Sequence, residues 1–335
     1  MASTRKLSTP QDYANLLSRY DTWLFDCDGV IWSGDEVIDG ASKAVEFLRN
    51  HGKRVIFVTN NAARSRPMLK KKFDRLGIAA TEDEIVSSAY AAAVYLKNVL
   101  KFPADRRVFV MGMEGIEAEL DTVGIQRCGG THPEDNKFLP ANDYSSLVEE
   151  GAIDPAVGAV VCGFDMHLNY AKLCKAYRYL TREGAQGPVL ARETGGGCHF
   201  ILTNDDKVVP AVGQLWPGSG SLATPLIDST KREPIVVGKP HAPMLETVKS
   251  LYNIDESRSI FVGDNLHTDI LFAQDGKMDS LLVLTGVTKE EDCQTEAIWP
   301  SFTMDSISNI VAAETGASRT GAVGVDGTIG IHASL

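Results

Sequence analysis

Residues Thr22–Val30 read T-W-L-F-D-C-D-G-V, and this stretch decides the fold. Its apolar run ends abruptly at Asp26-Cys27-Asp28-Gly29, which is typical of a buried strand that stops at a polar turn. A second apolar run over Arg54–Val58 stops in the same way at Thr59-Asn60-Asn61. Because continuous apolar strands need cover on both faces, the two runs predict a parallel sheet between layers of helices.

Helical patterns flank these strands. Pro10 follows Ser8-Thr9, a signal for a helix start, and apolar residues then recur at the spacing of one helical face up to Tyr20. The other predicted helices cover Ala41–Leu48, Arg66–Leu76, His241–Tyr252 and Thr268–Asp275. Further buried strands are predicted at Pro234–Val237, Ser259–Val262 and Ser280–Leu284. This alternation of strands and helices indicates a doubly wound α/β fold.

The middle of the chain, from about residue 105 to 230, contains strands of its own. They are predicted at Arg107–Met111, Ala156–Cys162 and Phe200–Thr203, with proline- and glycine-rich joints between them. We therefore expect a second α/β domain inserted into the first. The predicted segments are 1–100 and 233–314 for the outer domain, 101–232 for the inserted domain, and 315–335 for a flexible tail without chemistry.

The composition is that of an acidic globular protein. The 335 residues are 44% hydrophobic and 23% charged, and 33 Lys and Arg against 44 Asp and Glu leave a net charge of −11. This charge argues against binding to nucleic acid or to an anionic membrane. No apolar run approaches the roughly 18 residues of a membrane span, and Met1–Thr9 lacks the apolar core of a signal peptide. The six scattered cysteines form no metal-binding pair, so we expect reduced thiols in a cytoplasmic protein.

Four strands of the outer domain are predicted to end in polar clusters. These clusters are Asp26-x-Asp28, Thr59-Asn60-Asn61, Lys239, and Asp264 with Asp269. The carboxyl ends of parallel strands share one edge of a sheet, and ligands bind in the crevice at that edge. Carboxylates are the hard ligands that Mg²⁺ prefers, and a lysine supplies a compact positive charge for phosphate. The sequence therefore predicts a site for Mg²⁺ and a phosphoryl group.

The spacing of Asp26 and Asp28 gives their carboxyl groups different tasks. If Asp26 ends its strand, its carboxylate points into the crevice, where it can attack phosphorus and form an aspartyl-phosphate. Asp28 lies on the same side if the chain stays extended. It can then give a proton to the leaving group and later take one from water. Gly29 lets the backbone turn at that point.

Four stretches resemble the motifs of the haloacid dehalogenase (HAD) superfamily. They are Phe25–Val30 (F-D-C-D-G-V), Val58–Asn61 (V-T-N-N), Gly238–Pro240 (G-K-P) and Val262–Asp269 (V-G-D-N-L-H-T-D). Gly163–His167 and Pro217–Leu222 of the inserted domain are similar to the eukaryotic, fungal-like phosphoglycolate phosphatase / 4-nitrophenylphosphatase branch. The resemblance covers about residues 10–310, and four motifs in order are far more specific than any one of them.

This resemblance implies a role for each matching residue. Asp26 would be the nucleophile and a Mg²⁺ ligand, and Asp28 the general acid and base whose backbone carbonyl also binds the metal. Asp264 would be the second carboxylate on Mg²⁺, and Asp269 an acid that supports it. Lys239 would balance the charge between the nucleophile and the phosphoryl group.

The same resemblance places substrate contacts. Thr59, Asn60 and Asn61 would hold phosphoryl oxygens, although these residues could also merely cap a helix. Lys239 could likewise be a solvated loop lysine, and the flanking strand favours the site. His167 is a candidate substrate contact from the inserted domain, with a hydrogen-bonded core or interface histidine as the equal alternative.

The distances between motifs locate the inserted domain. Only 33 positions separate Asp26 from Thr59, which leaves room for a small flap around Trp32, a helix and a strand. The 180 positions from Thr59 to Lys239 exceed what the core needs, so the resemblance implies a C2-type cap domain after the second motif. Such a cap covers the crevice, leaves a small pocket and excludes competing water, which favours small phosphate esters over phosphoproteins.

Two further stretches have competing interpretations. Gly218-x-Gly220-x-x-Ala223 imitates a dinucleotide-binding fingerprint, but Trp216-Pro217 precede it in place of a strand, so we expect a loop that enters a helix. Asn204-Asp205-Asp206 is interpreted as a plain hairpin turn in preference to a substrate contact.

The resemblance implies a Mg²⁺-dependent phosphatase of a small phosphorylated metabolite, 2-phosphoglycolate first, with 4-nitrophenyl phosphate hydrolysed in vitro. Pyridoxal phosphate ranks lower, because that branch carries a histidine where this chain has Val209, and glycerol 3-phosphate is a further alternative. The alternative of another class is a catalytically silent HAD-fold regulatory protein. It predicts the loss of Asp26, Asp28, Lys239 or Asp264, and all four are present. The family also suggests a homodimer formed through the cap.

Overall fold

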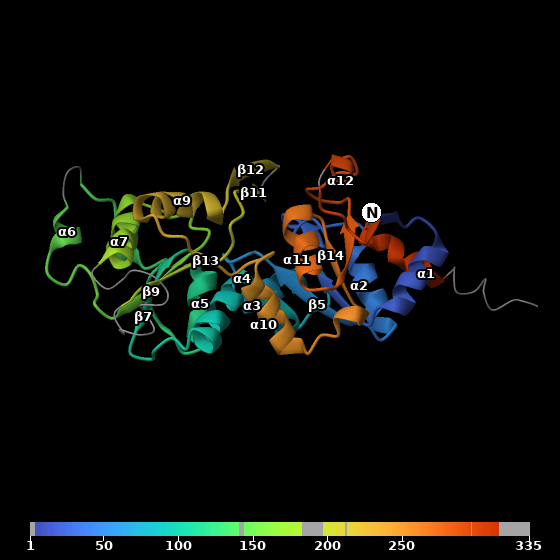
Figure 1. The fold of residues 1–335 in the computed structure, drawn as a ribbon, viewed down its shortest axis with the longest axis horizontal. Coiled ribbons are helices and arrows are strands. Elements are labelled where there is room, and N and C mark those ends of the chain that lie inside the picture. Colours follow the sequence, from blue (N-terminus) through green and yellow to red (C-terminus); the bar gives the residue numbers. More distant parts are fainter. Residues whose placement is uncertain (1–3, 141–143, 183–196, 212, 296, 315–335) are drawn as a thin grey trace, which may run out of the picture.

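The computed structural model describes residues 4–140, 144–182, 197–211, 213–295 and 297–314. The predicted tail, residues 315–335, lies outside the described residues. In the described part, the strands form two large sheets and two small hairpins. The two large sheets lie in opposite halves of an elongated molecule (Figure 1).

The first sheet contains the strand predicted at the start of Thr22–Val30. Its seven strands are all parallel. In spatial order they are β1 (Arg5–Lys6), β16 (Phe302–Met304), β15 (Asp279–Val283), β14 (Ser259–Gly263), β2 (Thr22–Phe25), β5 (Arg54–Thr59) and β6 (Ile85–Ser87). Strand β2 lies inside the sheet, where Leu24 pairs with Phe261 on one side and Ile56 on the other. The predicted parallel α/β sheet is confirmed.

Helices cover both faces of this sheet, as its continuous apolar strands require. Alternate side chains of β2 enter different apolar clusters, Trp23 and Phe25 on one face and Leu24 on the other. The first face is covered by α1 (Pro10–Arg19), α2 (Ala41–Asn50) and α3 (Arg66–Arg75). The second face is covered by α4 (Ser88–Val94), α10 (Ala242–Tyr252) and α11 (Leu271–Asp275).

Local signals set where these helices begin. Thr9 and Asp12 form a capping box at the start of α1, and Pro10 occupies its first position. The helix predicted from Thr268 begins earlier, at Leu266, because Asn265 accepts a hydrogen bond from the His267 N–H at 2.9 Å. Its first turn is a wide π turn, a form that helical periodicity does not reveal.

The second sheet belongs to the inserted part of the chain and has a core of its own. Its parallel strands are, in spatial order, β13 (Ile235–Val236), β10 (His199–Leu202), β9 (Val157–Cys162), β7 (Arg107–Met111) and β8 (Gln126–Gly129). Helices α5 (Glu114–Thr122), α7 (Tyr170–Thr181) and α9 (Ser219–Thr230) pack against it. Two sheets fit the predicted cap arrangement, and the boundaries at residues 100 and 232 stay predictions.

One strand was assigned to the wrong sheet. The run Pro234–Val237 is predicted in the outer domain, but among the described strands β13 pairs with β10 of the second sheet alone. An apolar run shows that a segment is a buried strand, and it does not show which of two sheets it joins. The pairing favours a cap boundary beyond Val236.

The remaining elements are short. The hairpins are β3 (Trp32–Ser33) with β4 (Glu36–Val37), and β11 (Val208–Ala211) with β12 (Gln214–Pro217). Short helices are α6 (Ser145–Val148) and α12 (Asp292–Thr295), and single turns are η1 (Glu82–Glu84), η2 (Tyr95–Val99), η3 (Pro133–Asn136), η4 (Glu256–Arg258), η5 (Leu266–Ile270) and η6 (Ile307–Ala312). Within the described ranges, no helix has the length and apolar character needed to cross a membrane.

Two local predictions need correction. A strand does precede Gly218, because Trp216 pairs with Val209 and Pro217 with Val208 in the β11–β12 hairpin. The predicted entry into a helix is confirmed, since α9 begins directly after Gly218. The stretch Asn204–Asp206 is not a hairpin turn, because β10 pairs with β9 and β13 and not with β11. It leads instead from the edge of the second sheet toward the first.

The carboxyl edges of the two sheets meet. Asn60 directly follows β5 of the first sheet, and its backbone oxygen accepts a hydrogen bond from Asn204 Nδ2 at 2.8 Å, just after β10 of the second. Lys239 follows β13 by three positions and donates its N–H to Asn60 Oδ1 at 2.8 Å. The polar strand ends of both sheets are therefore gathered in one place.

Candidate active site

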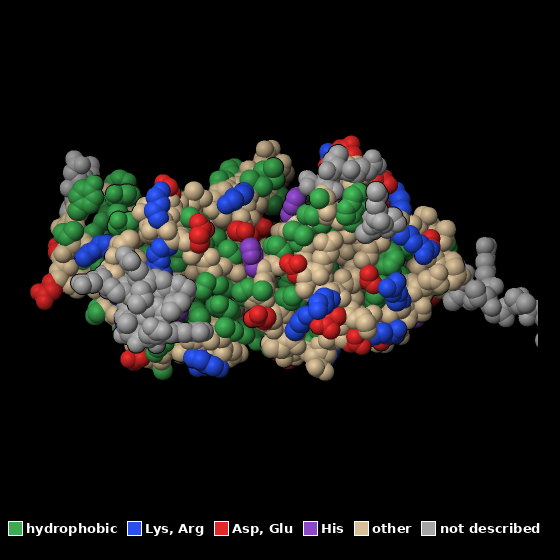
Figure 2. Space-filling view, in the orientation of Figure 1, with side chains coloured by type: hydrophobic (Ala, Val, Ile, Leu, Met, Phe, Trp, Pro, Cys, Tyr) green, Lys and Arg blue, Asp and Glu red, His purple; other side chains and the backbone are tan. Residues whose placement is uncertain are grey.

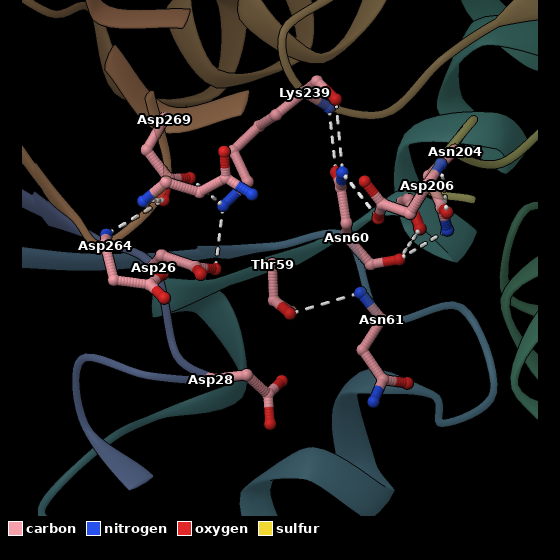
Figure 3. Close-up of polar contacts among 12 residues, drawn as sticks. Asp26, Asp28, Thr59, Asn60, Asn61, Asn204, Asp206, Lys239, Asp264 and Asp269 are labelled. Atoms are coloured by element: carbon pink, nitrogen blue, oxygen red, sulfur yellow. Dashed lines mark hydrogen bonds and ion pairs between the residues drawn. The ribbon is translucent and has the colours of Figure 1, made fainter. Parts of the chain in front are cut away.

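The structure brings the four predicted clusters together at this junction (Figure 3). Asp26 comes from the end of β2, Thr59 from the end of β5, and Asp264 from the end of β14. Lys239 reaches the same point from the second sheet, although it was predicted to follow a strand of the first. The candidate site is therefore formed by residues from both large sheets.

Lys239 is the central cation of the site. Its Nζ lies 2.7 Å from Asp26 Oδ1 and 2.8 Å from Asp269 Oδ1, and its side chain is only 2% exposed. Burial opposes the charge, but the carboxylates of Asp26 and Asp269 outweigh it and raise the pKa of the ammonium group. Lys239 therefore stays charged at neutral pH.

Three carboxylates surround this cation. Asp26, Asp264 and Asp269 each place one oxygen so that the three oxygens lie within 4.8 Å of one another. Burial, with Asp269 and Asp264 nearby, raises the pKa of Asp26 well above its usual range, and Lys239 acts in the opposite direction. Burial and Asp269 also raise the pKa of Asp264 to about 7. A site whose acids hold their protons this strongly lacks positive charge, which a divalent cation can supply.

Asp264 and Asp269 are held by different backbone groups. Val287 donates its N–H to Asp264 Oδ2 at 2.6 Å. Asp269 Oδ2 accepts the N–H groups of Asp264 and Asn265, both at 3.1 Å, while its Oδ1 accepts from Lys239. Both oxygens of Asp269 are thus occupied by protein donors, which suits the predicted supporting role.

Two glycines make room for the Asp264 carboxylate. A Cβ at Gly29 or at Gly286 would overlap this carboxylate. Gly29 also has a φ of +84°, so it needs both the left-handed backbone and the missing side chain. The glycine that follows Asp28 in sequence is therefore part of the packing of Asp264, 235 positions away.

Replacing Gly29 by alanine is expected to lower activity by about 10- to 100-fold, because displacing a positioned group by about 1 Å is that costly. If the acid cluster binds a divalent cation, the cation concentration for half-maximal rate should rise as well. Gly52→Ala is the matched control, since Gly52 has a φ of +70° and open space around its Cβ position. Steady-state rates against Mg²⁺ concentration would check this, and equal losses in both variants would contradict it.

Asp28 lies outside the acid cluster. Its Oδ1 accepts a hydrogen bond from Trp32 Nε1 at 2.8 Å, and its side chain is directed away from Lys239 (Figure 3). The backbone turns here through hydrogen bonds from Gly29 N–H to Trp32 O at 2.7 Å and from Trp32 N–H to Cys27 O at 3.1 Å. The chain therefore does not stay extended after Asp26, and the two acids of the first motif have separate environments. Their different tasks stay a prediction.

The three residues after β5 are placed differently from one another. Thr59 is buried, and its Oγ1 accepts from Asn61 N–H at 3.1 Å. Asn61 Oδ1 accepts from the N–H groups of Ala63 and Arg64, which caps the loop. The Asn60 amide donates to Lys239 O at 3.1 Å and to Asp206 Oδ2 at 3.2 Å, so this side chain points to the cap loop (Figure 3).

Asn204 and Asp206 join the candidate site, although the sequence favours a plain hairpin turn for them. Both lie on the loop after β10 and hold Asn60, one through its backbone oxygen and the other through its amide. Burial raises the pKa of Asp206, and the hydrogen bond from Asn60 opposes this. A signal was present, because a polar triplet directly after a buried strand is the same pattern that marks Asp26 and Thr59.

His167 is not brought into contact with the other candidates. It is exposed on the loop after β9, where its backbone N–H donates to Asp165 Oδ1 at 2.8 Å. The alternative of a core histidine is therefore wrong, and that of an interface histidine stays a prediction. The loop follows the carboxyl end of a cap strand, so the predicted substrate contact stays a prediction.

Comparisons with known proteins agree with the motifs. The family model of haloacid dehalogenase-like hydrolases matches residues 23–126, and a second one, described as HAD-hydrolase-like, matches residues 236–310. The 4-nitrophenylphosphatase of Schizosaccharomyces pombe is 44% identical over 91% of this chain and 98% of its own length. Phosphoglycolate phosphatase 2 of Arabidopsis thaliana is 42% identical over 91% of this chain and 97% of its own.

A solved structure extends the likeness to the fold. The glycerol phosphate phosphatase of Mycobacterium tuberculosis, in complex with calcium, superimposes with a TM-score of 0.68 at 27% identity, over 88% of this chain and 76% of that one. All three proteins are named phosphatases, and the likeness spans both sheets. This chain belongs to the haloacid dehalogenase-like hydrolase family and is a phosphoric monoester hydrolase.

Proposed function

We propose that the chain is a Mg²⁺-dependent phosphatase that hydrolyses 2-phosphoglycolate through an aspartyl-phosphate on Asp26. The observation that carries this proposal is the contact of Lys239 Nζ with Asp26 Oδ1 at 2.7 Å, inside the cluster of Asp26, Asp264 and Asp269. A carboxylate beside an ammonium group at the carboxyl edge of a parallel sheet is placed to react with a phosphoryl group bound there.

The donor set fits Mg²⁺. Clustered carboxylate oxygens without cysteine or histidine suit a hard divalent cation, and one ammonium group balances only part of their charge. We assign the carboxylates of Asp26 and Asp264 and the backbone carbonyl of Asp28 as ligands, with Asp269 in support. When bound, Mg²⁺ stabilises the negative charge on the phosphoryl oxygens.

The proposed reaction has two displacements at phosphorus. A carboxylate oxygen of Asp26 forms a bond to phosphorus while the bond to the ester oxygen breaks, and Asp28 gives its proton to the departing oxygen. Asp28, now a carboxylate, takes a proton from water as that water attacks the aspartyl-phosphate. Inorganic phosphate leaves, and both acids return to their starting state.

The phosphoryl oxygens are assigned to residues around Asp26. Lys239 Nζ and Thr59 Oγ1 are assigned as direct donors. Asn61 Nδ2 is assigned the same task, because the hydrogen bonds of this side chain to described residues use its Oδ1. Asn60 is assigned a backbone contact, since its side chain is occupied by Lys239 and Asp206. This revises the role predicted for the Asn60 side chain.

A small metabolite suits the position of the cap. The cap loop that carries Asn204 and Asp206 is hydrogen-bonded to the core beside Lys239, which leaves little space for a protein substrate. We assign His167 as a candidate contact for the far end of the metabolite. The six free thiols, four of them buried, are typical of a reducing compartment, and we propose the cytoplasm.

A homodimer through the cap is also proposed. Hydrophobic side chains gather at the far end of the cap, over α6 and α7, where Tyr144, Val148 and Tyr170 are more than half exposed (Figure 2). Together with α9 they line a groove of about 420 Å³. Exposed apolar patches of this kind mark contact surfaces, and sedimentation at micromolar concentration would give the oligomeric state.

Other substrates remain as alternatives. Glycerol 3-phosphate is favoured by the name of the mycobacterial structure, and pyridoxal phosphate is disfavoured by Val209. A catalytically silent regulatory protein would need no ion pair between Lys239 and Asp26.

The function is tested by rates with small phosphate esters. The kcat/KM for 2-phosphoglycolate is expected to exceed those for glycerol 3-phosphate and pyridoxal phosphate by at least about tenfold, a difference of about 1.4 kcal/mol in transition-state binding. Removal of metal with EDTA should abolish release of nitrophenol from 4-nitrophenyl phosphate, and Mg²⁺ should restore it. A preference for another ester would reassign the substrate, and unchanged activity in EDTA would refute the metal requirement.

A further inference from the structure

The acid of the first motif is held by a tryptophan from the flap. Trp32 is fully buried, and its Nε1 donates to Asp28 Oδ1 at 2.8 Å. The indole N–H is a donor only, so it needs a lone pair on Oδ1. The carbonyl oxygen of a protonated carboxyl group is a better acceptor than its hydroxyl oxygen, so this hydrogen bond favours a proton on Oδ2, the other oxygen of Asp28.

The Trp32 ring is itself held from the side of helix α3. Phe73 meets it edge-on at 4.8 Å between ring centres. Lys72 Nζ lies 4.2 Å from the centre of the ring and donates to Gly34 O, in the turn of the β3–β4 flap, at 2.7 Å. Lys72 is 8% exposed, so its charge is buried against an aromatic face and one carbonyl group.

Burying the charge of a lysine against an aromatic ring and one carbonyl group costs folding free energy. Such a residue is therefore a candidate for a role in the site. Burial lowers the pKa of Lys72, and the nearby charge of Asp28 opposes this. The contacts form a continuous path from Lys72 through the Trp32 ring to the Asp28 carboxyl group. The path fixes the rotation of that carboxyl group, and no described residue forms a hydrogen bond with Oδ2.

We propose that Trp32 is a positioning residue for Asp28, and that Lys72 holds Trp32 in place for this task. The inference rests on the proposed function, in which Asp28 gives a proton to the leaving oxygen. Because Oδ1 accepts the indole N–H, Oδ2 is held in one orientation, from which it can donate the proton to the leaving oxygen. Without the indole N–H, the carboxyl group is free to rotate, and protonation of the leaving group slows.

The leaving group distinguishes this role from a purely structural one. 4-Nitrophenolate is a stable anion that departs without a proton. The phenol and alcohol leaving groups of the other two esters need a proton as they depart. We compare kcat/KM for 4-nitrophenyl phosphate, phenyl phosphate and glycerol 3-phosphate, because kcat/KM reports the first phosphoryl transfer. Phenyl and 4-nitrophenyl phosphate share their aromatic shape, so their ratio reports the need for acid.

Trp32→Phe keeps an aromatic ring beside Phe73 and Lys72 and removes the N–H. Its kcat/KM is expected to fall by about 10- to 100-fold for phenyl phosphate and glycerol 3-phosphate, and by less than about threefold for 4-nitrophenyl phosphate. Trp23→Phe is the matched control, because Trp23 is also fully buried and its Nε1 has no hydrogen-bond partner among the residues that the structure describes. The control should change all three rates by the same small factor.

Lys72→Met tests the path if Trp32→Phe does not fold, and should give the same pattern with a smaller loss. Equal loss for all three esters, or no loss for any, would overturn the proposal. Asp28→Asn separates this from a failure of the proposed function. If Asp28→Asn does not discriminate between leaving groups, the acid role of Asp28 is wrong. If Asp28→Asn discriminates between leaving groups and neither Trp32→Phe nor Lys72→Met does, only the role proposed for Trp32 is wrong.

Discussion

Asp26→Asn should lower kcat for 4-nitrophenyl phosphate by at least about 10⁴-fold, the scale of loss when other enzymes lose their nucleophile. An amide nitrogen cannot replace the carboxylate oxygen that attacks phosphorus. The fold should persist, because Lys239 keeps its contact with Asp269 at 2.8 Å. The variant also removes one of three crowded acids, so the melting temperature should stay level or rise slightly.

The measurement combines turnover with trapping of the intermediate. Acid quenching during turnover should leave phosphate covalently bound to the wild-type chain and none bound to Asp26→Asn. Asp105→Asn is the matched control, since it makes the same chemical change at an exposed position and should keep full activity. Turnover by Asp26→Asn within tenfold of wild type would refute the mechanism.

The sequence was informative where burial and position along a strand decide the structure. The run around Trp23 is apolar throughout because helices cover both faces of its sheet, and that pattern is readable without coordinates. Asp26 and Thr59 were placed correctly at strand ends for the same reason. Parallel strands then bring their carboxyl ends to one edge, whatever separates them along the chain.

Lys239 shows what the pattern could not decide. The strand before Lys239 is predicted correctly, but the sequence of its two residues does not show which of the two sheets the strand joins. Pairing depends on which edge is free after folding, which is a tertiary property. The lysine therefore reaches Asp26 from the cap sheet, and the site joins both halves of the chain.

Asn60 shows a second limit. Its residue type fits a phosphate contact, but its amide is used by Lys239 and by Asp206, which lies 146 positions away. Such a contact depends on how the cap packs against the core, and local sequence does not show that Asn60 and Asp206 are close in space. Trp32 is similar: the sequence marked a flap around it, and only the structure relates its indole to Asp28.

Lys239→Met should lower activity by at least about 10³-fold and also destabilise the protein. The side chain is 2% exposed and contacts two carboxylates, and removing one partner of a buried ion pair costs about 3–5 kcal/mol. Methionine keeps much of the stem volume, so the loss reports charge and not a cavity. Thermal denaturation in EDTA should show a melting temperature several degrees below that of wild type.

Mg²⁺ should restore more stability to Lys239→Met than it adds to the wild-type protein. In the variant, Asp26, Asp264 and Asp269 face one another without a cation, so each positive charge that enters the cluster has a larger effect. Lys249→Met is a matched control, because Lys249 pairs with Glu256 at a partly exposed position, where ion pairs contribute at most about 1 kcal/mol. Its melting temperature should respond to Mg²⁺ as wild type does. An equal Mg²⁺ response in both variants would mean that the acid cluster is not the metal site, because the lysine charge would then be irrelevant to cation binding.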